Sequence, residues 1–404
     1  MPYERKKLLV VSPWESEWSL GVEAGVSDDF YFVRGFTRAG FELHFLVPEG
    51  GGKTDERSDD VRTHTYPNFF HKTRNLPQFV RRLTWPWMFN SVVLPRALSL
   101  ARSLRPDFVL GHSHYAAKTT RRCRRELGIP AGLKLFGVMD LVHTEWPRWK
   151  YFFKNFEQIA ALRHPQDAWI VLDDGTRGDR VLASRGLPKE KIFFLPNGVN
   201  LEWQDTTFDR AAARATLGIR DDARVVLFLA RFVASKRPQE VISIIPRVVE
   251  KTSADVVFVF AGDGPERPAC EALARRLGVS DSAVFIGIVP HADVPRIMTA
   301  SDLFITTSSL TNMAIPTCEA FICGLPAAAY DTGDTNRVVV PGETGLLVED
   351  SNRARLADAV ATLLNDEGEL KRLGDNARRF ARENFTGWDQ RIQMELDIIN
   401  RLID

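Results

Sequence analysis

The sequence predicts an α/β protein made of two doubly wound domains, each built on a parallel sheet. Short apolar runs alternate with helical patterns along the whole chain, which is typical of repeated βαβ units. The 404 residues exceed one ordinary core. A polar, irregular stretch over 199–217 interrupts the alternation. We therefore expect a first domain over 1–198, a second over 199–387, and a C-terminal helix over 388–404 that packs back across the junction.

The expected strands are short apolar runs bounded by turn residues or helical patterns. In the first domain they are Leu8–Val11, Glu42–Val47, Asp107–Leu110, Leu133–Val138, Trp169–Leu172 and Ile192–Leu195. In the second they are Val225–Ala230, Val256–Ala261, Val284–Ile286, Leu303–Ile305, Ala327–Ala329 and Leu346–Val348. Because ligands of such sheets bind where the strands end, the loops that follow these strands are the first places to look for a site.

Composition excludes several classes of protein. The net charge of +1 gives no overall field that favours nucleic acid. The first apolar run is too short for a signal peptide, and no run approaches the length of a membrane span. The four cysteines contain no C-x-x-C pair and suggest a reducing compartment. We expect a cytoplasmic protein.

Residues 66–105 differ from the rest of the chain, because Arg and Lys alternate with Phe and Trp and acidic residues are absent. Two interpretations remain open. The stretch is an amphipathic helical insertion packed on its own domain, or it is a surface for anionic lipid or a lipid-linked substrate. The second interpretation implies peripheral contact with the inner face of a membrane. Base stacking is chemically feasible, but nothing else supports it, so we expect no nucleic-acid partner.

Two features of the first domain are candidates for a ligand site. Gly21 and Gly25, in the loop after the first strand, would let a ligand approach the backbone, although turns need glycine too. His112 and His114 follow the strand at Asp107–Leu110. A neutral histidine there can bind a sugar hydroxyl or a reacting group, or can be structural. No third ligand follows at useful spacing, so we expect no metal site.

Two strand-end loops of the second domain carry cations and glycines. Arg231 and Lys236 follow the strand VVLFLA, where two cations would neutralise a diphosphate or form a solvated basic turn. Gly262 and Gly264 follow the next strand and would bring the backbone close to a ligand.

A third loop precedes a helix that starts near Pro316. It contains Ser308, Thr311, Asn312, Met313 and Ala314. Within that otherwise apolar helix, the lone carboxylate of Glu319 either accepts hydrogen bonds from vicinal sugar hydroxyls or is simply solvated. Together the three loops suit a nucleotide-sugar better than a dinucleotide, whose usual G-x-G-x-x-G fingerprint after the first strand is absent.

The second half resembles the donor-binding domain of the family-four retaining glycosyltransferases (glycosyl transferases group 1). The resemblance is carried, in order, by LFLARFVASKRP, FVFAGDGPER, VFIGIVPHADVPRIMTASDLFITTSS, CEAFICGLPAAAYDTG and PGETGLLVED. The first half resembles the acceptor domain more loosely, through its glycine loop, RPDFVLGHSH and FLPNGVN. The resemblance implies the GT-B fold, in which two Rossmann-like domains face each other across a cleft.

The same resemblance implies roles for individual residues. Arg231 and Lys236 would hold the donor diphosphate, the backbone at Val289 would meet the base, and Glu319 would bind the ribose. His112 would line the acceptor side near the anomeric carbon. Members of this fold generally need no metal, so a nucleoside diphosphate sugar would be the co-substrate and no cofactor is expected.

The chain also departs from the family pattern. The family has a glutamate eight positions before the one that matches Glu319, and this chain has Thr311 there. Glycines usually follow, where this chain has Asn312, Met313 and Ala314.

From the resemblance we expect retaining sugar transfer to a glycan or lipid-linked acceptor in cell-surface polysaccharide or glycoconjugate synthesis. The alternative is a catalytically degenerate GT-B protein with a binding or regulatory role.

Overall fold

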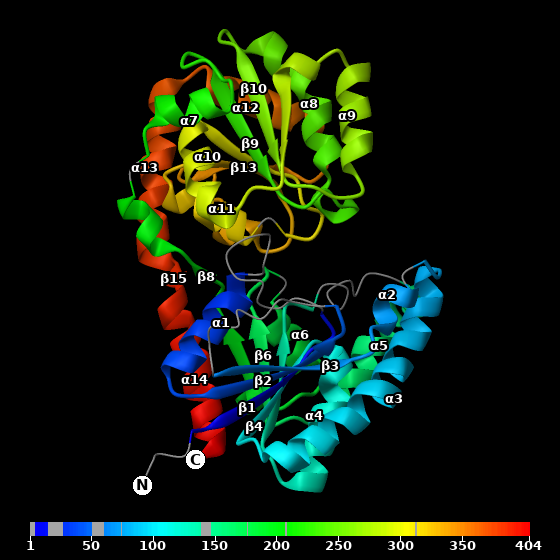
Figure 1. The fold of residues 1–404 in the computed structure, drawn as a ribbon. Helices are drawn as coiled ribbons and strands as arrows, with labels where there is room; N and C mark the ends of the chain where they lie inside the picture. The colour runs from blue at the N-terminus through cyan, green and yellow to red at the C-terminus, as the bar shows by residue number, and fades with distance from the viewer. Residues whose placement is uncertain are drawn as a thin grey trace. The chain divides into compact units, whose positions relative to one another are not determined.

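The computed structural model describes residues 5–14, 27–50, 60–73, 75–138, 147–175, 177–206, 208–311 and 313–404. The chain divides into two compact units. The first comprises Met1–Asp173, Arg177–Asn197 and Trp388–Asp404, and the second comprises Asp174–Thr176 and Gly198–Gly387. Figure 1 shows a parallel sheet between helices in each unit.

The first unit is built on a seven-stranded parallel sheet in the order β3-β2-β1-β4-β5-β6-β7. Its strands are β1 (Lys7–Val11), β2 (Glu42–Pro48), β3 (Val61–Tyr66), β4 (Phe108–His112), β5 (Ala131–Leu135), β6 (Ala168–Leu172) and β7 (Ile192–Leu195). Its helices are α1 (Ser27–Arg38), α2 (Phe69–Thr73), α3 (Gln78–Leu104), α4 (Ala117–Leu127), α5 (Arg148–Leu162), α6 (Gly178–Ser184) and α14 (Trp388–Ile403). Helices α1 and α14 pack on one face of the sheet, and α3 and α4 pack on the other.

The second unit has a six-stranded parallel sheet in the order β11-β10-β9-β12-β13-β14. Its strands are β9 (Arg224–Leu229), β10 (Val256–Ala261), β11 (Ala283–Gly287), β12 (Leu303–Thr306), β13 (Ala327–Asp331) and β14 (Gly345–Glu349). Its helices are α7 (Arg210–Thr216), α8 (Pro238–Lys251), α9 (Arg267–Arg276), α10 (Val294–Ala300), α11 (Ile315–Ile322), α12 (Arg353–Leu364) and α13 (Glu367–Asn384). Helices α8, α9 and α12 cover one face, and α10, α11 and α13 cover the other.

These two parallel-sheet units confirm the predicted fold class. The edge strand β3 was not predicted, because its residues Val-Arg-Thr-His-Thr-Tyr are mostly polar and only its last side chain is buried. The two-residue pair β8 (Gly198–Val199) and β15 (Thr386–Gly387) was not predicted either, because it is too short to give a pattern.

Helix α14 is joined to the first unit by a buried ionic cluster. Arg391 and Glu395 of α14 pair with each other, and Arg391 lies 3.0 Å from Asp28 of α1. Lys134 of β5 pairs with Asp28 and lies 3.2 Å from Glu395. Burial by itself would raise the pKa of Asp28, but the charges of Arg391 and Lys134 outweigh it and hold that pKa below its usual range. The last helix is therefore an integral part of the first unit's core.

Candidate functional site

In the second unit, the loop after β9 is held in place by the loop after β12. The Thr307 hydroxyl donates to the carbonyl oxygens of Lys236 (3.1 Å) and Arg237 (3.0 Å). The amide of Ser309 donates to the carbonyl oxygen of Ser235 (2.9 Å). These bonds fix the backbone that carries Lys236 at the carboxyl edge of the sheet, the usual ligand edge of such a fold.

Lys236 is a half-buried cation close to a second cation. Burial lowers its pKa most, the charge of Arg231 lowers it further, and Asp174 opposes both. Arg231 is exposed on the same loop. Burial and the neighbouring positive charge both disfavour the charged form of Lys236. A bound anion would therefore stabilise that charged form. A diphosphate is the kind of group that such a pair can neutralise.

Gly262 and Gly264 make room for the protein's own backbone. Their φ angles are +124° and +152°. A Cβ on Gly262 would clash with the carbonyl oxygen of Ala230. A Cβ on Gly264 would lie 2.5 Å from the carbonyl oxygen of Phe232. The amide of Phe232 also donates to the carbonyl oxygen of Asp263 (2.9 Å). Both glycines therefore hold the β10 loop against the β9 loop, and their contact with a donor stays a prediction.

Thr311 stands in a closed space rather than on an open surface. Its hydroxyl accepts a hydrogen bond from the amide of Met313 (3.1 Å). A Cβ on Gly175 would clash with the Thr311 hydroxyl, and a Cβ on Gly333 would lie 3.1 Å from the Thr311 Cβ. Thr311 thus braces its own loop between two glycines that have positive φ angles.

The remaining residues of this loop surround the start of α11. The Ser308 carbonyl oxygen accepts a hydrogen bond from the Thr332 hydroxyl (3.0 Å), so the loop is tied to the strand end after β13. Ala314 immediately precedes α11. Asn312 lies outside the described residues.

Glu319 is buried on α11, which removes the solvated alternative. Its carboxylate is hydrogen-bonded to the ring of His291, with Oε1 2.9 Å from Nε2. The centroid of the Trp203 indole lies 5.0 Å from the centroid of the His291 imidazole. Val289 lies two residues before His291 and packs on the hydrophobic core of this unit. Sequence reasoning missed His291 and Trp203, and the only signal for His291 was its place in the segment VPHADVP after a strand.

In the first unit, His112 is buried and Gly21 and Gly25 lie outside the described residues. The His112 ring lies edge-on to Phe32 and Phe136, with centroids 6.1 and 5.4 Å away. Burial, and then the charge of Lys134, lower the pKa of His112 to about 4. His112 is therefore neutral at physiological pH, and it reaches a ligand only if its surroundings rearrange.

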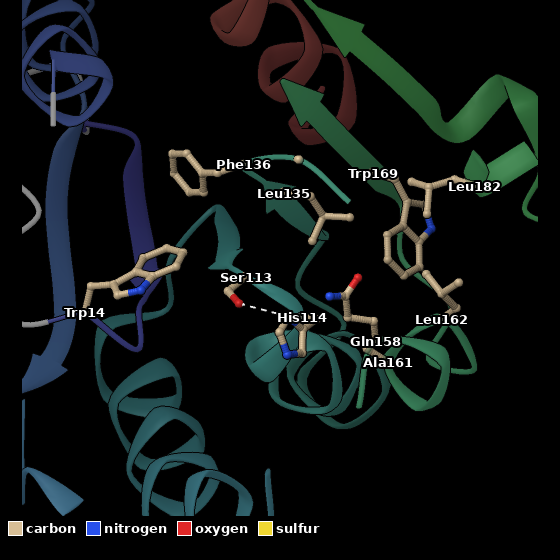
Figure 2. Close-up of a pocket in the computed structure, with 11 residues that line it drawn as sticks. Trp14, Ser113, His114, Leu135, Phe136, Gln158, Ala161, Leu162, Trp169 and Leu182 are labelled. Atoms are coloured by element: carbon tan, nitrogen blue, oxygen red, sulfur yellow. Dashed lines mark hydrogen bonds between the residues drawn. The ribbon is translucent and has the colours of Figure 1, made fainter. Parts of the chain in front are cut away.

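The next histidine, His114, lines a pocket of about 190 Å³ at the carboxyl ends of β4 and β5, to which Trp169 near the start of β6 also contributes (Figure 2). The lining residues are Trp14, Ser113, His114, Leu135, Phe136, Gly137, Gln158, Ala161, Leu162, Trp169 and Leu182. Figure 2 shows Trp14 and Trp169 on opposite sides, with His114 and Gln158 between them. Mostly apolar walls with a few placed polar groups are typical of a small-molecule site.

Hydrogen bonds orient the polar side of this pocket. His114 Nδ1 lies 3.2 Å from the Ser113 hydroxyl, and its Nε2 lies 3.4 Å from a Glu157 carboxylate oxygen. The Tyr115 hydroxyl donates to the same oxygen (2.9 Å). Burial and the charge of Glu157 raise the pKa of Tyr115, which therefore stays a neutral donor. His114 is thus held in one orientation toward the pocket.

The described residues contain neither a metal-binding cluster nor a membrane-spanning helix. Across 5–14, 27–50 and the other described ranges, no three His, Cys, Asp or Glu side chains gather in a way that could hold a metal ion. In the same part of the chain, no helix is both long enough and apolar enough to span a membrane.

Two known families match the chain in succession. Residues 30–203 match the family described as "Glycosyltransferase Family 4". Residues 209–380 match the family described as "Glycosyl transferases group 1". A curated relative, the alpha-D-kanosaminyltransferase of Streptomyces kanamyceticus, is 29% identical over 212 residues, which are 52% of this chain and 54% of that protein. The chain spans about half the length of the curated relatives it matches.

Solved structures match over nearly the whole chain. Sucrose-phosphate synthase from Thermosynechococcus elongatus has a TM-score of 0.75 at 18% identity, over 98% of this chain and 99% of that chain. The Anabaena protein HepE in complex with UDP-glucose has a TM-score of 0.72 at 17% identity, over 97% of this chain and 99% of that chain. At these identities the likeness shows the fold alone. The two family matches show that this chain belongs to the family-four, group 1 glycosyltransferases, and the parallel-sheet units and structural neighbours show that it has their GT-B fold.

Proposed function

We propose that this protein is a glycosyltransferase that takes a sugar from a nucleoside diphosphate sugar, with retention of configuration and without a metal ion. The observation that carries the proposal is the half-buried Lys236 beside Arg231 at the ligand edge of the second unit. Glu319 and His291 supply a carboxylate and an imidazole in the same unit. The HepE structure, named as a complex with UDP-glucose, supports the same class of donor.

In the proposed reaction, the bond between the anomeric carbon and the diphosphate oxygen breaks, and negative charge grows on the leaving group. Lys236 and Arg231 stabilise that charge, since fixed cations in a partly dry site act strongly on a developing anion. A bond to the acceptor oxygen forms on the same face of the sugar, and the leaving phosphate oxygen takes the acceptor proton. In this proposal no protein nucleophile is needed, because the acceptor oxygen attacks directly and the leaving phosphate oxygen takes its proton.

The acceptor is proposed to be a glycan or a lipid-linked sugar of a cell-surface polysaccharide or glycoconjugate, used on the cytoplasmic side of the membrane. The pocket with Trp14, Phe136, His114 and Gln158 supports an acceptor with both apolar and hydroxyl-bearing parts.

Substitution of the central cation tests the proposal. Lys236→Ala should lower turnover of the donor by about 100-fold or more, as expected for loss of one group that stabilises transition-state charge. Lys251→Ala is the matched control, since Lys251 is an exposed lysine whose partner Asp358 also pairs with Arg247. Circular dichroism and the urea midpoint should match the parent for both variants. A fully active Lys236→Ala protein contradicts the proposal.

A second candidate function is that of a degenerate GT-B protein that binds a nucleotide or a partner without catalysis. The observation that favours it is Thr311, enclosed by Gly175 and Gly333 where the family has a carboxylate. Binding of a nucleoside diphosphate without turnover of any sugar derivative would favour this candidate, and turnover of a single donor would exclude it.

A further inference from the structure

The described large apolar side chains that face solvent are concentrated in the first unit. They are Trp14, Leu76, Leu83, Trp87, Trp149, Phe152 and Phe153. In the second unit the corresponding residues are Val249, Leu277 and Ile288, none of them aromatic. Exposed aromatic residues in such number are unusual for a surface that meets only water.

Six of these residues belong to α3, its preceding turn, and α5, and we call them the α3/α5 patch: Leu76, Leu83, Trp87, Trp149, Phe152 and Phe153. Leu83 and Trp87 are one helical turn apart, as are Trp149 and Phe153, so each pair shares a face of its helix. Trp87 is 70% exposed and Trp149 is 67% exposed. The Arg82 guanidinium donates to the backbone carbonyls of Phe153 and Lys154, which joins the two helices at the patch.

The surroundings of the α3/α5 patch are basic. Residues 66–105 contain no acid, and α5 adds Arg148, Lys150 and Lys154. The only acid of α5, Glu157, is a hydrogen-bond partner of Tyr115 in the interior of the unit. Exposed aromatic rings bordered by cations are the chemistry that binds an anionic lipid surface, because the rings enter the headgroup region and the cations meet lipid phosphates.

Helix α5 connects the patch to the pocket. Its first half exposes Phe152 and Phe153, and its second half lines the pocket through Gln158, Ala161 and Leu162. At 1.5 Å per residue, Phe153 and Gln158 are only about 7.5 Å apart along the helix axis. A molecule anchored in a surface that touches the patch therefore starts close to the pocket.

We propose that the α3/α5 patch docks the protein on an anionic lipid surface, so that a lipid-anchored acceptor enters the His114 pocket from that surface. Entry of a lipid-anchored acceptor into the pocket rests on the proposed function, whereas docking on the lipid surface does not. A second copy of the chain is a poorer occupant, because a two-fold contact through the patch would bring its own cations together.

Co-flotation with vesicles tests the docking. The full chain should bind vesicles of phosphatidylcholine mixed with phosphatidylglycerol, bind pure phosphatidylcholine at least tenfold more weakly, and lose affinity as salt rises. Trp87→Ser with Phe153→Ser should weaken binding to the anionic vesicles roughly tenfold or more. Arg148→Gln with Lys150→Gln should do the same at low salt.

Matched controls come from the second unit. Val249→Ser with Leu277→Ser removes exposed apolar residues there, and Arg275→Gln with Arg276→Gln removes exposed cations. Both controls should bind vesicles like the parent. Three results would overturn the docking. The controls and the patch variants lose vesicle binding equally, the parent binds neutral vesicles as well as anionic ones, or light scattering shows a dimer that Trp87→Ser dissociates. Tighter binding of the patch to single-stranded RNA than to anionic vesicles would also overturn it.

A nucleotide measurement on the same variants separates the two proposals. Patch variants should keep the parent's thermal shift with nucleoside diphosphates, because the patch lies in the other unit. Loss of vesicle binding with nucleotide binding intact is the result expected of a docking surface. If the parent binds nucleotide but no vesicle, only the docking is wrong. If the parent binds vesicles but no nucleotide, only the proposed function is wrong.

Discussion

The two units share one architecture but place their charges differently. In the first unit, Lys134 and Arg391 are completely buried and paired with carboxylates. In the second unit, Arg231 and Lys236 lie on a strand-end loop, where burial and then the charge of Arg231 lower the pKa of Lys236. The first arrangement fixes a helix in a core, and the second is unfavourable until an anion binds. Equal numbers of cations thus have a structural use in one sheet and, in our proposal, a ligand-binding use in the other.

Ion pairs give the largest expected difference between the units. Arg391→Met leaves Asp28 and Glu395 in the core with one cation fewer, which should cost about 3–5 kcal/mol of unfolding free energy. Arg220→Met is the control, because its pairs with Asp222 and Asp255 in the second unit are exposed and their loss should cost about 1 kcal/mol or less. Urea unfolding compares them. Similar losses for both variants would show that the buried cluster does not hold α14.

The buried histidine of the first unit predicts a pH effect. In the folded protein His112 has a pKa of about 4, against an ordinary value of 6.5. Between these values the unfolded chain binds the proton and the folded chain does not. Stability should therefore be fully present above pH 6.5 and fall by at most roughly 3 kcal/mol as the pH drops to 4.

The matched variant for this effect is His112→Asn. It removes this proton and leaves Lys134, Asp28 and Glu395 near the site. The other histidines of the chain are also unchanged. Its urea midpoint should fall less steeply than that of the parent over the same pH range. Parallel curves would contradict a neutral, buried His112.

Loop glycines of the second unit should show a moderate effect. Gly262→Ala places a Cβ against the Ala230 carbonyl oxygen, so the β9 and β10 loops must separate, at a cost of about 1–3 kcal/mol. Gly278→Ala is the control, because Gly278 also has a positive φ of +70° but nothing within 4 Å of its added Cβ. Equal urea midpoints for the two variants would show that the loops are not packed as described.

The smallest expected effect concerns the missing carboxylate of the family pattern. Thr311→Ser keeps the hydroxyl that accepts from the Met313 amide, and it should leave turnover within about threefold of the parent. Thr311→Glu needs room that Gly175 and Gly333 close off, so it should lower the melting temperature without raising turnover. Steady-state assays with the preferred donor check both. Higher turnover in Thr311→Glu would mean that the space opens when the donor binds.

The sequence predicted the second unit better than the first, for a physical reason. Buried parallel strands are apolar runs, so the fold class and most strands could be predicted, whereas the polar edge strand β3 could not. Lys236 stands on a strand-end loop and Glu319 is a lone carboxylate in an apolar helix, and both are local signals of a candidate ligand site. The contact between Glu319 and His291 joins residues 28 positions apart, and no local pattern reports it.

In the first unit, the decisive features depend on burial rather than on pattern. His112 and His114 look equivalent in the sequence, yet one is enclosed by aromatic rings and the other lines a pocket. The contribution of α5 to the exposed patch was also missed, because only the stretch 66–105 stood out by composition. For the stretch 66–105, α3 packs on its own unit through Phe89 and Val93, as the first interpretation expects. It also exposes Leu83 and Trp87, and their contact with lipid stays a prediction.

We propose above that the second unit binds a nucleoside diphosphate through Arg231 and Lys236. The most direct measurement is a thermal-shift panel of UDP, GDP, ADP and TDP with their sugar derivatives, without added metal, on the parent and on Lys236→Ala. A ligand at about 100 times its dissociation constant adds roughly 2.7 kcal/mol of stability, which raises the melting temperature measurably. We expect a shift with one nucleotide series in the parent and the loss of that shift in Lys236→Ala. No shift with any series in the folded parent, or an equal shift in both proteins, would contradict it.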